Sequence, residues 1–549
     1  MTDGESPLPI WTPALIETPE PALTPAPAPA AARERRGGSM GSSAGGSTRR
    51  PPIVSPARRP VGQNVFRVGI VVAISFAIVA AGAGYWQVFQ ASALSNEPDN
   101  PAVVAAARQI VRGVISDRTG TVLATSKNDK NGEPYRVYTD PSMSSIIGYA
   151  SRQFGTAGLE RAYDAQLTGS VRSDPLQELL KKFDANPYDP QSLQLNISLT
   201  LQRDAVNGLG SDLGAVVMLD PRTGKILAMA STPTFNASAV ANPTTGAAAF
   251  AALQKSKQNP LLNRATQGLY VPGSVFKIVT ATAGLGSGAI TPSTTYPQQP
   301  PAEQNGLVVD GCKITDEPKP WIYGKFLDLD SATENSSNVW FALTGLKTGG
   351  AALTDWAGRL GFGKPIPFDL PTAVSQVTSG GGSFGGGFKD EVELANAAYG
   401  QAETLVTPLQ MALVAATIAN GGVEMQPQLV NSITSAKTGT TQIQPKVMSN
   451  VLPANLAADI SQAMLQAVEG QYGMLFTTGA AVPGIPTAGK SGTAQLGSGE
   501  PNSWFIGFAP ANNPTVAIAV VVEHGGHGGA RAAPLAGQLL RAYFASVKP

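Results

Sequence analysis

The sequence predicts an α+β protein: an antiparallel sheet flanked by helices, preceded by a small N-terminal α+β domain and one transmembrane helix. Three observations support this prediction. Apolar strand patterns occur early in the main part of the chain, at 214–230, and again near its end, at 503–509 and 516–522, with helical segments between them. This order predicts a sheet that the end of the chain completes. A shorter strand pattern at 112–124 and an uncharged apolar run at 68–90 precede these elements.

Composition narrows the class of protein. A chain of 549 residues is long enough for more than one domain. Its net charge of +1 does not suggest a nucleic-acid partner, and the low charged fraction of 14% fits an exported enzyme with many loops. Cys312 is the single cysteine, so no intramolecular disulfide can form, and we interpret this residue as structural.

The chain begins with a tail and an apolar segment. Residues 1–66 are rich in Pro, Ala, Gly and Ser, which predicts a disordered tail. Residues 67–90 are predicted to form a transmembrane helix, because the apolar run is about the ~20 residues that span a bilayer. Tyr85 and Trp86 suit the membrane interface, and the arginines of the tail place that tail in the cytoplasm.

A cleaved signal peptide is the alternative to an anchor. Ala91-Ser92-Ala93 resembles a cleavage site, but the apolar run is long for a signal peptide and the preceding tail is very long. We therefore expect a single-pass anchor in the plasma membrane, with residues 91–549 outside the cytoplasm.

Two domains are expected beyond the anchor. Residues 91–197 are predicted to form a small membrane-proximal domain of the pedestal or dimerisation kind, with a hairpin at 112–124 and a short amphipathic helix beginning within 155–164. Residues 198–549 are predicted to form the larger domain. Its helical segments are expected around 334–361 and 391–420, and from 534 to 545.

One local pattern is suited to nucleophilic catalysis. Pro272 and Gly273 end the preceding segment, and the apolar run after Ser274 has the length and spacing of a buried helix. Lys277 would then lie one turn from Ser274 on the same face. A serine hydroxyl needs a neighbouring base, and a desolvated amine can serve. The chain contains no other Ser-x-x-Lys, so Ser274 is the candidate nucleophile.

A serine–lysine site needs further polar groups, and Ser-x-Asn is a known component. The pattern occurs twice, at 126–128 and at 336–338. Ser336 and Asn338 follow Ser274 in the expected order and stand at the start of a helical segment. Helix capping would explain them equally well in isolation. Their order and spacing favour the catalytic interpretation.

The third component, Lys-[Ser/Thr]-Gly, occurs three times. The copy at 347–349 is expected to end a helix, and the copy at 437–439 is expected to form an exposed turn. Lys490-Ser491-Gly492, followed by Thr493, precedes a buried strand. Only this copy is expected on a sheet edge that faces Ser274. We also expect repulsion between Lys490 and Lys277 to help keep Lys277 neutral.

With these residues in place, the chain resembles the class B penicillin-binding proteins, which are membrane-anchored peptidoglycan D,D-transpeptidases. The resemblance covers most of residues 107–545. It rests on matching stretches at 112–124, 158–164, 220–224, 272–274, 399–401, 407–412, 419–422 and 504–510. Two departures are small: Ser491 stands where many relatives have threonine, and the membrane-proximal domain is short for the class.

The resemblance implies a role for each catalytic residue. Ser274 would attack the D-Ala–D-Ala bond of a stem peptide and form an acyl-enzyme, and Lys277 would take its proton. Ser336 would relay a proton to the leaving D-Ala, and Asn338 would hold the substrate backbone. Lys490 would supply positive potential.

Substrate-binding residues and partners are implied in the same way. Ser491, Gly492 and Thr493 would bind the substrate, with the hydroxyls on its terminal carboxylate. The N–H groups of Ser274 and Thr493 would form the oxyanion hole. β-Lactams would acylate Ser274, and no cofactor or metal is implied. A SEDS-type glycosyltransferase is the expected protein partner.

Other interpretations stay open. A β-lactamase or β-lactam sensor would use the same motifs, and a catalytically weak scaffold could hold a glycan polymerase. His524 and His527 lie in a glycine-rich loop, and we expect no metal there because nothing nearby supplies a full ligand set. Elongation, division and sporulation are all compatible with the sequence, as are several acceptor amines.

Overall fold

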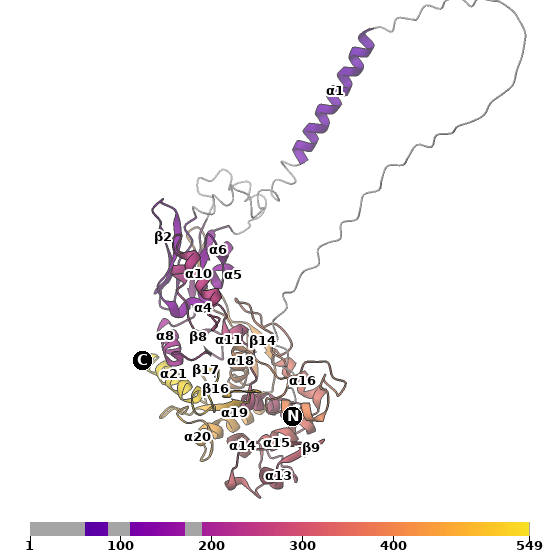
Figure 1. Ribbon diagram of the computed structural model, residues 1–549, viewed down its shortest axis with the longest axis vertical. Coiled ribbons are helices and arrows are strands. Elements are labelled where there is room, and N and C mark those ends of the chain that lie inside the picture. Colours follow the sequence, from indigo (N-terminus) through magenta and orange to yellow (C-terminus); the bar gives the residue numbers. More distant parts are fainter. Residues whose placement is uncertain (1–60, 86–109, 171–188, 548–549) are drawn as a thin grey trace, which may run out of the picture. The chain divides into compact units, whose positions relative to one another are not determined.

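A computed structural model describes residues 61–85, 110–170 and 189–547, and these divide into two compact units with the boundary between Phe89 and Gln90 (Figure 1). Residues 1–60 of the predicted tail and the stretch at 91–93 that resembles a cleavage site lie outside the described residues. Residues 61–66, which were also predicted to belong to the disordered tail, are helical.

The first unit contains one described helix, α1 (Val61–Gly84). Its 20 residues from Val65 to Gly84 have a mean hydropathy of 2.3 and are not covered by other parts of the protein. At 1.5 Å per residue, such a segment spans roughly 30 Å, which matches a bilayer core. In length and composition α1 therefore fits the predicted membrane helix.

The second unit is built on a five-stranded antiparallel sheet with the order β15-β16-β17-β7-β8. The strands are β7 (Gly214–Leu219), β8 (Ile226–Thr232), β15 (Ala488–Ala494), β16 (Asn502–Ala509) and β17 (Val516–Val522). Early and late strands thus pair as predicted, and β17 lies between β16 and β7.

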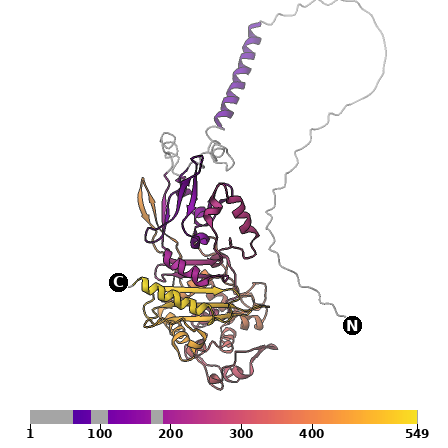
Figure 2. The same cartoon turned by 60° about the vertical axis from the view of Figure 1, so that its left-hand side comes forward.

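Helices cover both faces of this sheet, which explains why its strands are apolar on both sides. On one face lie α8 (Leu199–Leu209) and α21 (Ala532–Ser546), the yellow helix of Figure 2. On the other face lie α18 (Pro408–Ala419) and the short α11 (Arg264–Gln267). β15 is an edge strand, so one of its sides is free to face the active-site elements.

A mostly helical region packs beside β15. Its first elements are the 3₁₀ helix η3 (Gly273–Phe276), α12 (Lys277–Gly286), α13 (Gln299–Asn305), β9 (Leu307–Val309), β10 (Cys312–Ile314) and η4 (Pro320–Ile322). The later ones are α14 (Leu329–Glu334), α15 (Asn338–Thr348), α16 (Gly350–Arg359), α17 (Glu391–Ala397), α19 (Ala454–Glu469) and α20 (Gly473–Phe476). The predicted segment 334–361 is divided at Gly349, whose φ is 81°.

Sequence patterns did not reveal α13 and α19. Helix α13 is short and contains two prolines, residues that usually mark turns and loops. Helix α19 nevertheless packs against α14 and β15, so it helps to hold the two sides of the site together.

This unit also contains a six-stranded sheet with the strand order β13-β12-β6-β1-β2-β3. They are β1 (Ile115–Ser116), β2 (Val122–Asn128), β3 (Pro134–Tyr138), β6 (Ser192–Leu195), β12 (Val430–Ser435) and β13 (Gly439–Gln442). The predicted hairpin at 112–124 is β1–β2. The β12–β13 hairpin comes from a distant part of the chain. Its exposed turn contains Lys437 and Thr438, as expected, and Gly439 begins β13.

Short elements complete this unit. Around the six-stranded sheet lie η2 (Pro141–Met143), α4 (Ser144–Ile147), β4 (Ala150–Ser151), β5 (Gly155–Thr156), α5 (Leu159–Ala162), α6 (Asp164–Thr168), α9 (Ala237–Ala241) and α10 (Gly246–Lys255). A two-stranded sheet pairs β11 (Val423–Met425) with β14 (Val447–Asn450).

Candidate active site

Ser274 lies in η3, where the chain turns into α12. Gly273, just before it, has φ 57°, and a Cβ there would lie 2.5 Å from the carbonyl oxygen of Thr493. Trp504 of β16 donates to the carbonyl of Val271 at 3.0 Å. The turn that contains Ser274 therefore packs closely against the edge strand. The first turn after Pro272 is a 3₁₀ turn and not an α-helical one.

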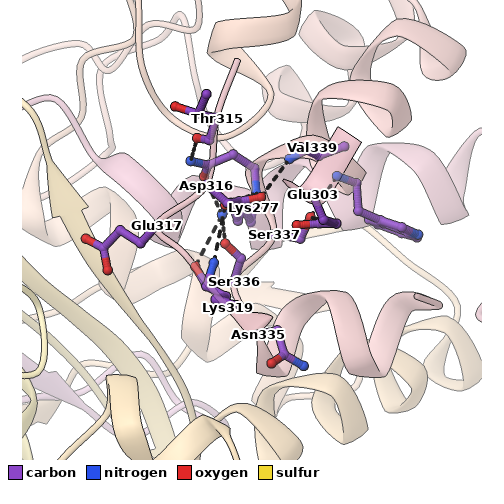
Figure 3. Close-up of polar contacts among 12 residues, drawn as sticks. Lys277, Glu303, Thr315, Asp316, Glu317, Lys319, Asn335, Ser336, Ser337 and Val339 are labelled. Carbon is purple, nitrogen blue, oxygen red and sulfur yellow. Dashed lines mark hydrogen bonds and ion pairs between the residues drawn. The ribbon is translucent and has the colours of Figure 1, made fainter. Parts of the chain in front are cut away.

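Lys277, the first residue of α12, is fully buried. Its amine lies 2.7 Å from the carbonyl oxygen of Ser336, 3.2 Å from Ser336 Oγ and 2.8 Å from Asn338 Oδ1 (Figure 3). The Asn338 amide donates through Nδ2 to the carbonyl of Thr315 at 3.1 Å, so its oxygen faces the lysine. The lysine of the Ser-x-x-Lys motif thus contacts both the serine and the asparagine of the Ser-x-Asn motif.

Capping, the alternative explanation of the Ser336–Asn338 stretch, is performed by its middle residue. Ser337 is the N-cap of α15, and its Oγ accepts from the Trp340 N–H at 2.9 Å. Ser336 precedes the cap with φ 53°, a conformation that a non-glycine residue adopts rarely. Because Ser337 caps the helix, the side chains of Ser336 and Asn338 are left to face Lys277.

Strand β15 supplies the remaining predicted residues. Lys490 is buried, and its amine donates to the carbonyl of Ser491 at 3.0 Å. A Cβ on Gly492 would lie 2.9 Å from the carbonyl oxygen of Pro272, so glycine permits the close contact of this strand with η3. The Thr493 Oγ1 accepts from the Gly528 N–H at 3.3 Å.

These elements enclose a cleft of about 1170 Å³. Its lining includes Ser274, Ser336, Asn338, Ser491 and Thr493. Lys277 and Lys490 lie buried next to these lining residues, and Gly492 lies in the strand between two of them. The structure therefore brings all eight predicted site residues together.

Burial and neighbouring charges shift both lysines toward the neutral form. Burial lowers the pKa of Lys277 well below its usual value, and the positive charge of Lys490 lowers it further, as expected from the sequence. Burial, aided by the positive charge of Lys319, lowers the pKa of Lys490 to about 7. An amine that is neutral near pH 7 can accept a proton from a serine.

Sequence reasoning missed three charged residues beside the motifs. Glu303 comes from α13, and Asp316 and Lys319 come from the loop between β10 and η4 (Figure 3). All three are buried, and Lys319 forms an ion pair with Asp316 at 3.3 Å. No motif marks them, because a charged residue in a polar loop is normally solvent-exposed.

The glycine-rich loop with the two histidines borders the cleft. His527 Nδ1 lies 3.4 Å from Glu317 Oε1, and both side chains are exposed. His524 Nδ1 lies 3.0 Å from the carbonyl oxygen of Glu500. Within residues 61–85, 110–170 and 189–547, no group of three or more His, Cys, Asp and Glu residues is arranged to hold a metal ion.

Comparisons with known proteins agree with this site. The family described as "Penicillin binding protein transpeptidase domain" matches residues 214–541, and "Penicillin binding protein A dimerisation domain" matches residues 112–189. Peptidoglycan D,D-transpeptidase PbpA of Mycolicibacterium smegmatis is 33% identical over 492 residues, which are 85% of this chain and 96% of that protein.

Solved structures agree as well. Penicillin-binding protein A from M. tuberculosis, solved as a ceftriaxone acyl-enzyme complex, has a TM-score of 0.69 and 31% identity, and the match covers 80% of this chain and 99% of that one. The D,D-transpeptidase domain of a peptidoglycan glycosyltransferase from Eggerthella lenta has a TM-score of 0.68, with 31% identity and coverage of 80% and 99%.

The chain belongs to the penicillin-binding protein transpeptidase family. The predicted family, the α+β fold and the enzyme class, a transpeptidase, are confirmed.

Proposed function

We propose that this protein is a peptidoglycan D,D-transpeptidase in which Ser274 is the nucleophile and Lys277 its base. One observation carries this proposal: a buried amine lies one helical turn from Ser274 and contacts both Ser336 and Asn338 within a single cleft. A stem peptide ending in D-Ala–D-Ala is the donor substrate.

In the acylation step, Ser274 Oγ attacks the carbonyl carbon of the penultimate D-Ala while neutral Lys277 takes the hydroxyl proton. The backbone N–H groups of Ser274 and Thr493 stabilise the oxyanion. When the C–N bond breaks, the proton passes through the Ser336 hydroxyl to the amine of the leaving D-Ala. The product is an ester on Ser274, and Lys277 is neutral again.

In the second step, the amine of a neighbouring stem peptide attacks the ester carbonyl. Lys277 takes a proton from this amine, the C–O bond to Ser274 breaks, and the proton returns to Ser274 Oγ. The new amide is the crosslink. Asn338 orients the donor backbone, and the Lys490 ammonium with the hydroxyls of Ser491 and Thr493 attracts the terminal carboxylate.

Labelling with a fluorescent penicillin tests this function. The β-lactam should form one stable adduct, seen by intact mass, that peptide mapping assigns to Ser274, and Ser274→Ala should lose it. With lipid II polymerised by a glycosyltransferase, the wild-type protein should also produce dimeric muropeptides. An adduct on another residue would contradict the site, and rapid release of hydrolysed penicillin would favour a β-lactamase.

The remaining chain supports a membrane-bound arrangement. Residues 67–90 would anchor the protein in the plasma membrane, with residues 1–66 as a cytoplasmic tail. Residues 91–197 would form a membrane-proximal domain and residues 198–549 the penicillin-binding domain. A SEDS-type glycosyltransferase would contact the anchor and the membrane-proximal domain. Protease added to intact cells should cut the large domain and spare an epitope on the tail; the reverse pattern would contradict this topology.

A further inference from the structure

Beside the predicted motifs lies a cluster of buried charges that none of the motifs contains. It consists of Glu303, Asp316 and Lys319. Buried charged groups are costly unless they are paired and hydrogen-bonded, so a cluster next to the candidate nucleophile requires an explanation.

Asp316 holds the N-terminus of α15. Its Oδ1 and Oδ2 accept from the backbone N–H of Asn338 at 2.8 and 3.0 Å, and Oδ2 also lies 3.3 Å from the N–H of Val339. A carboxylate here is favoured by the unpaired N–H groups and by the helix dipole. Asp316 therefore sets where Asn338, and with it the preceding Ser336, lies relative to Lys277.

Glu303 contacts the same segment from the other side. Its Oε1 accepts from Ser337 Oγ at 2.5 Å and from Gln299 Nε2 at 2.9 Å. Its Oε2 is buried, and no described residue donates to it. The charge of the neighbouring Asp316 carboxyl adds to the effect of burial in raising the pKa of Glu303. A proton on Glu303 Oε2 would turn this unpaired oxygen into a donor to Asp316, whereas two ionised carboxylates would repel.

The contacts of Lys277 suit a neutral amine. A neutral amine has two N–H groups, and two oxygens that can only accept, the Ser336 carbonyl and Asn338 Oδ1, use both. Its lone pair is then left for a hydroxyl that can donate, and Ser336 Oγ is 3.2 Å away.

We propose that Glu303, Asp316 and Lys319 form a positioning unit that holds the groups around the catalytic lysine in place and sets the balance of charge around its amine. Asp316, through the Asn338 N–H, and a protonated Glu303, through Ser337 Oγ, hold the Ser336–Asn338 segment around the amine. The Lys319 ammonium pairs with Asp316 and opposes protonation of Lys277. This inference rests on the proposed function, because it assigns Lys277 as the base.

The surrounding charges agree with these roles. Burial and then the Lys490 charge lower the pKa of Lys277 most; the negative charge of Asp316 acts to raise it, and the positive charge of Lys319 acts to lower it. Burial, with the Asp316 charge next, raises the pKa of Glu303 to about 7. The Asp316 pKa is lowered, against the effect of burial, by Lys319 first and Lys277 second.

Further elements packed against α13 add little charge near Glu303. Strand β9 and η4 carry no titratable side chain within their bounds, and the one charged residue of α15, Lys347, lies over the Tyr296 ring. Among the described residues, the charged groups that act on Glu303 or on which it acts are thus Asp316 and Lys277.

The test measures the rate constant of Ser274 acylation by a fluorescent penicillin against pH, with the full chain in detergent. The rate should rise with pH as Lys277 loses its proton. Asp316→Asn should move this acid limb to lower pH by ~1 unit, and Lys319→Gln should move it to higher pH by ~1 unit. Glu303→Gln should leave the position of the acid limb unchanged. Glutamine, like a protonated glutamate, is neutral and has one accepting and one donating group.

Asp355→Asn is the matched control, since it removes an exposed aspartate paired with Arg359 and should not move the limb. Equal rate losses at every pH, without movement of the limb, would show a merely structural role and overturn the inference. If Asp316→Asn or Lys319→Gln does not fold, the Glu303→Gln variant tests the inference alone. An acid limb at lower pH in this variant would show that Glu303 is ionised in the wild-type protein and would overturn the inference. If the wild-type protein is not acylated at Ser274 at any pH, the proposed function itself fails.

Discussion

Individual residues in this site adopt unfavourable states that their neighbours enforce. Ser336 has a left-handed backbone, and Lys277 and Lys490 are buried amines. A left-handed backbone at a residue such as Ser336 costs on the order of 1–3 kcal/mol and persists only where the surrounding structure holds it. Here two contacts hold the segment from Ser336 to Asn338. Ser337, its middle residue, caps α15, and the Asp316 carboxylate accepts from the Asn338 N–H.

The pKa of Lys490 predicts an alkaline limit to acylation. Below its pKa of about 7 this lysine is an ammonium that attracts a carboxylate, and above it the amine is neutral. We expect the second-order rate constant for penicillin acylation to fall about tenfold for each pH unit above this pKa, since this constant reports on the free enzyme. Stopped-flow fluorescence between pH 6 and 9 measures it.

Lys490→Gln is the comparison for this limit. It should be slower than the wild-type protein near pH 6 and should lack the alkaline limb, because no charge is left to titrate. A wild-type rate that stays flat from pH 7 to 9 would argue against the role of the Lys490 charge.

At the scale of elements, the contact between η3 and β15 decides whether the site is assembled. Gly273→Ala would place a Cβ 2.5 Å from the Thr493 carbonyl oxygen and would strain a φ of 57°. We expect acylation of Ser274 to fall by roughly 100-fold, because small displacements of reacting groups are costly. Rates of fluorescent penicillin labelling, with circular dichroism to check folding, test this.

Gly288→Ala provides the matched control. Gly288 has φ 73°, but nothing lies within 4 Å of its Cβ position. It should lose about 1 kcal/mol of stability from backbone strain and keep its acylation rate. Equal rates for the two variants would contradict the importance of the contact.

Strand β11 contains a buried carboxyl that predicts a pH-dependent stability. Glu424 Oε1 and Gln410 Oε1 are both buried without a donor from the described residues, and both lie near Gly361. Burial raises the pKa of Glu424 from 4.5 to about 8, so a protonated Glu424 can donate to its neighbour.

Because this pKa is raised on folding, the stability from protonated Glu424 is full below pH 4.5 and is lost as pH rises through 8. Between these values the loss is on the order of 1 kcal/mol for each pH unit. Glu424→Gln should therefore raise the melting temperature clearly at pH 8 and little at pH 5. The exposed Glu500→Gln should show no such difference, and equal melting gains at both pH values would contradict the prediction.

At the scale of the whole molecule, segments far apart in the chain are held together by a few buried groups. Beside the six-stranded sheet, Glu160 of α5 is fully buried and accepts from Arg112 at 2.8 Å and from Arg136 at 2.6 Å. The sheet itself combines β6 with the β12–β13 hairpin, which lies more than 200 residues further along the chain.

Glu160→Ala should destabilise this region by about 3–5 kcal/mol, because it leaves buried arginine charges unpaired. Thermal unfolding should begin at a lower temperature, while Ser274 acylation at low temperature persists. Asp164→Ala removes a half-exposed partner of the same Arg112 and should cost at most ~1 kcal/mol. Similar losses in the two variants would show that burial of Glu160 is not decisive.

The catalytic motifs could be predicted from sequence because they depend on local spacing. The three-residue separation of Ser274 and Lys277 places both on one face of a helical turn, and the strand and turn patterns around Lys490 distinguished it from two other copies. The apolar strand patterns at 214–230, 503–509 and 516–522 likewise predicted the central sheet.

Tertiary structure alone decided which distant segments pair and which charges are buried. Nothing local to 430–442 indicates that this hairpin joins β6, and nothing local to Glu303, Asp316 or Lys319 distinguishes them from solvent-exposed loop residues. Strand pairing and desolvation depend on neighbours brought from elsewhere in the chain. Local spacing therefore determined the chemical groups of the site, and long-range packing determined their protonation and their positions.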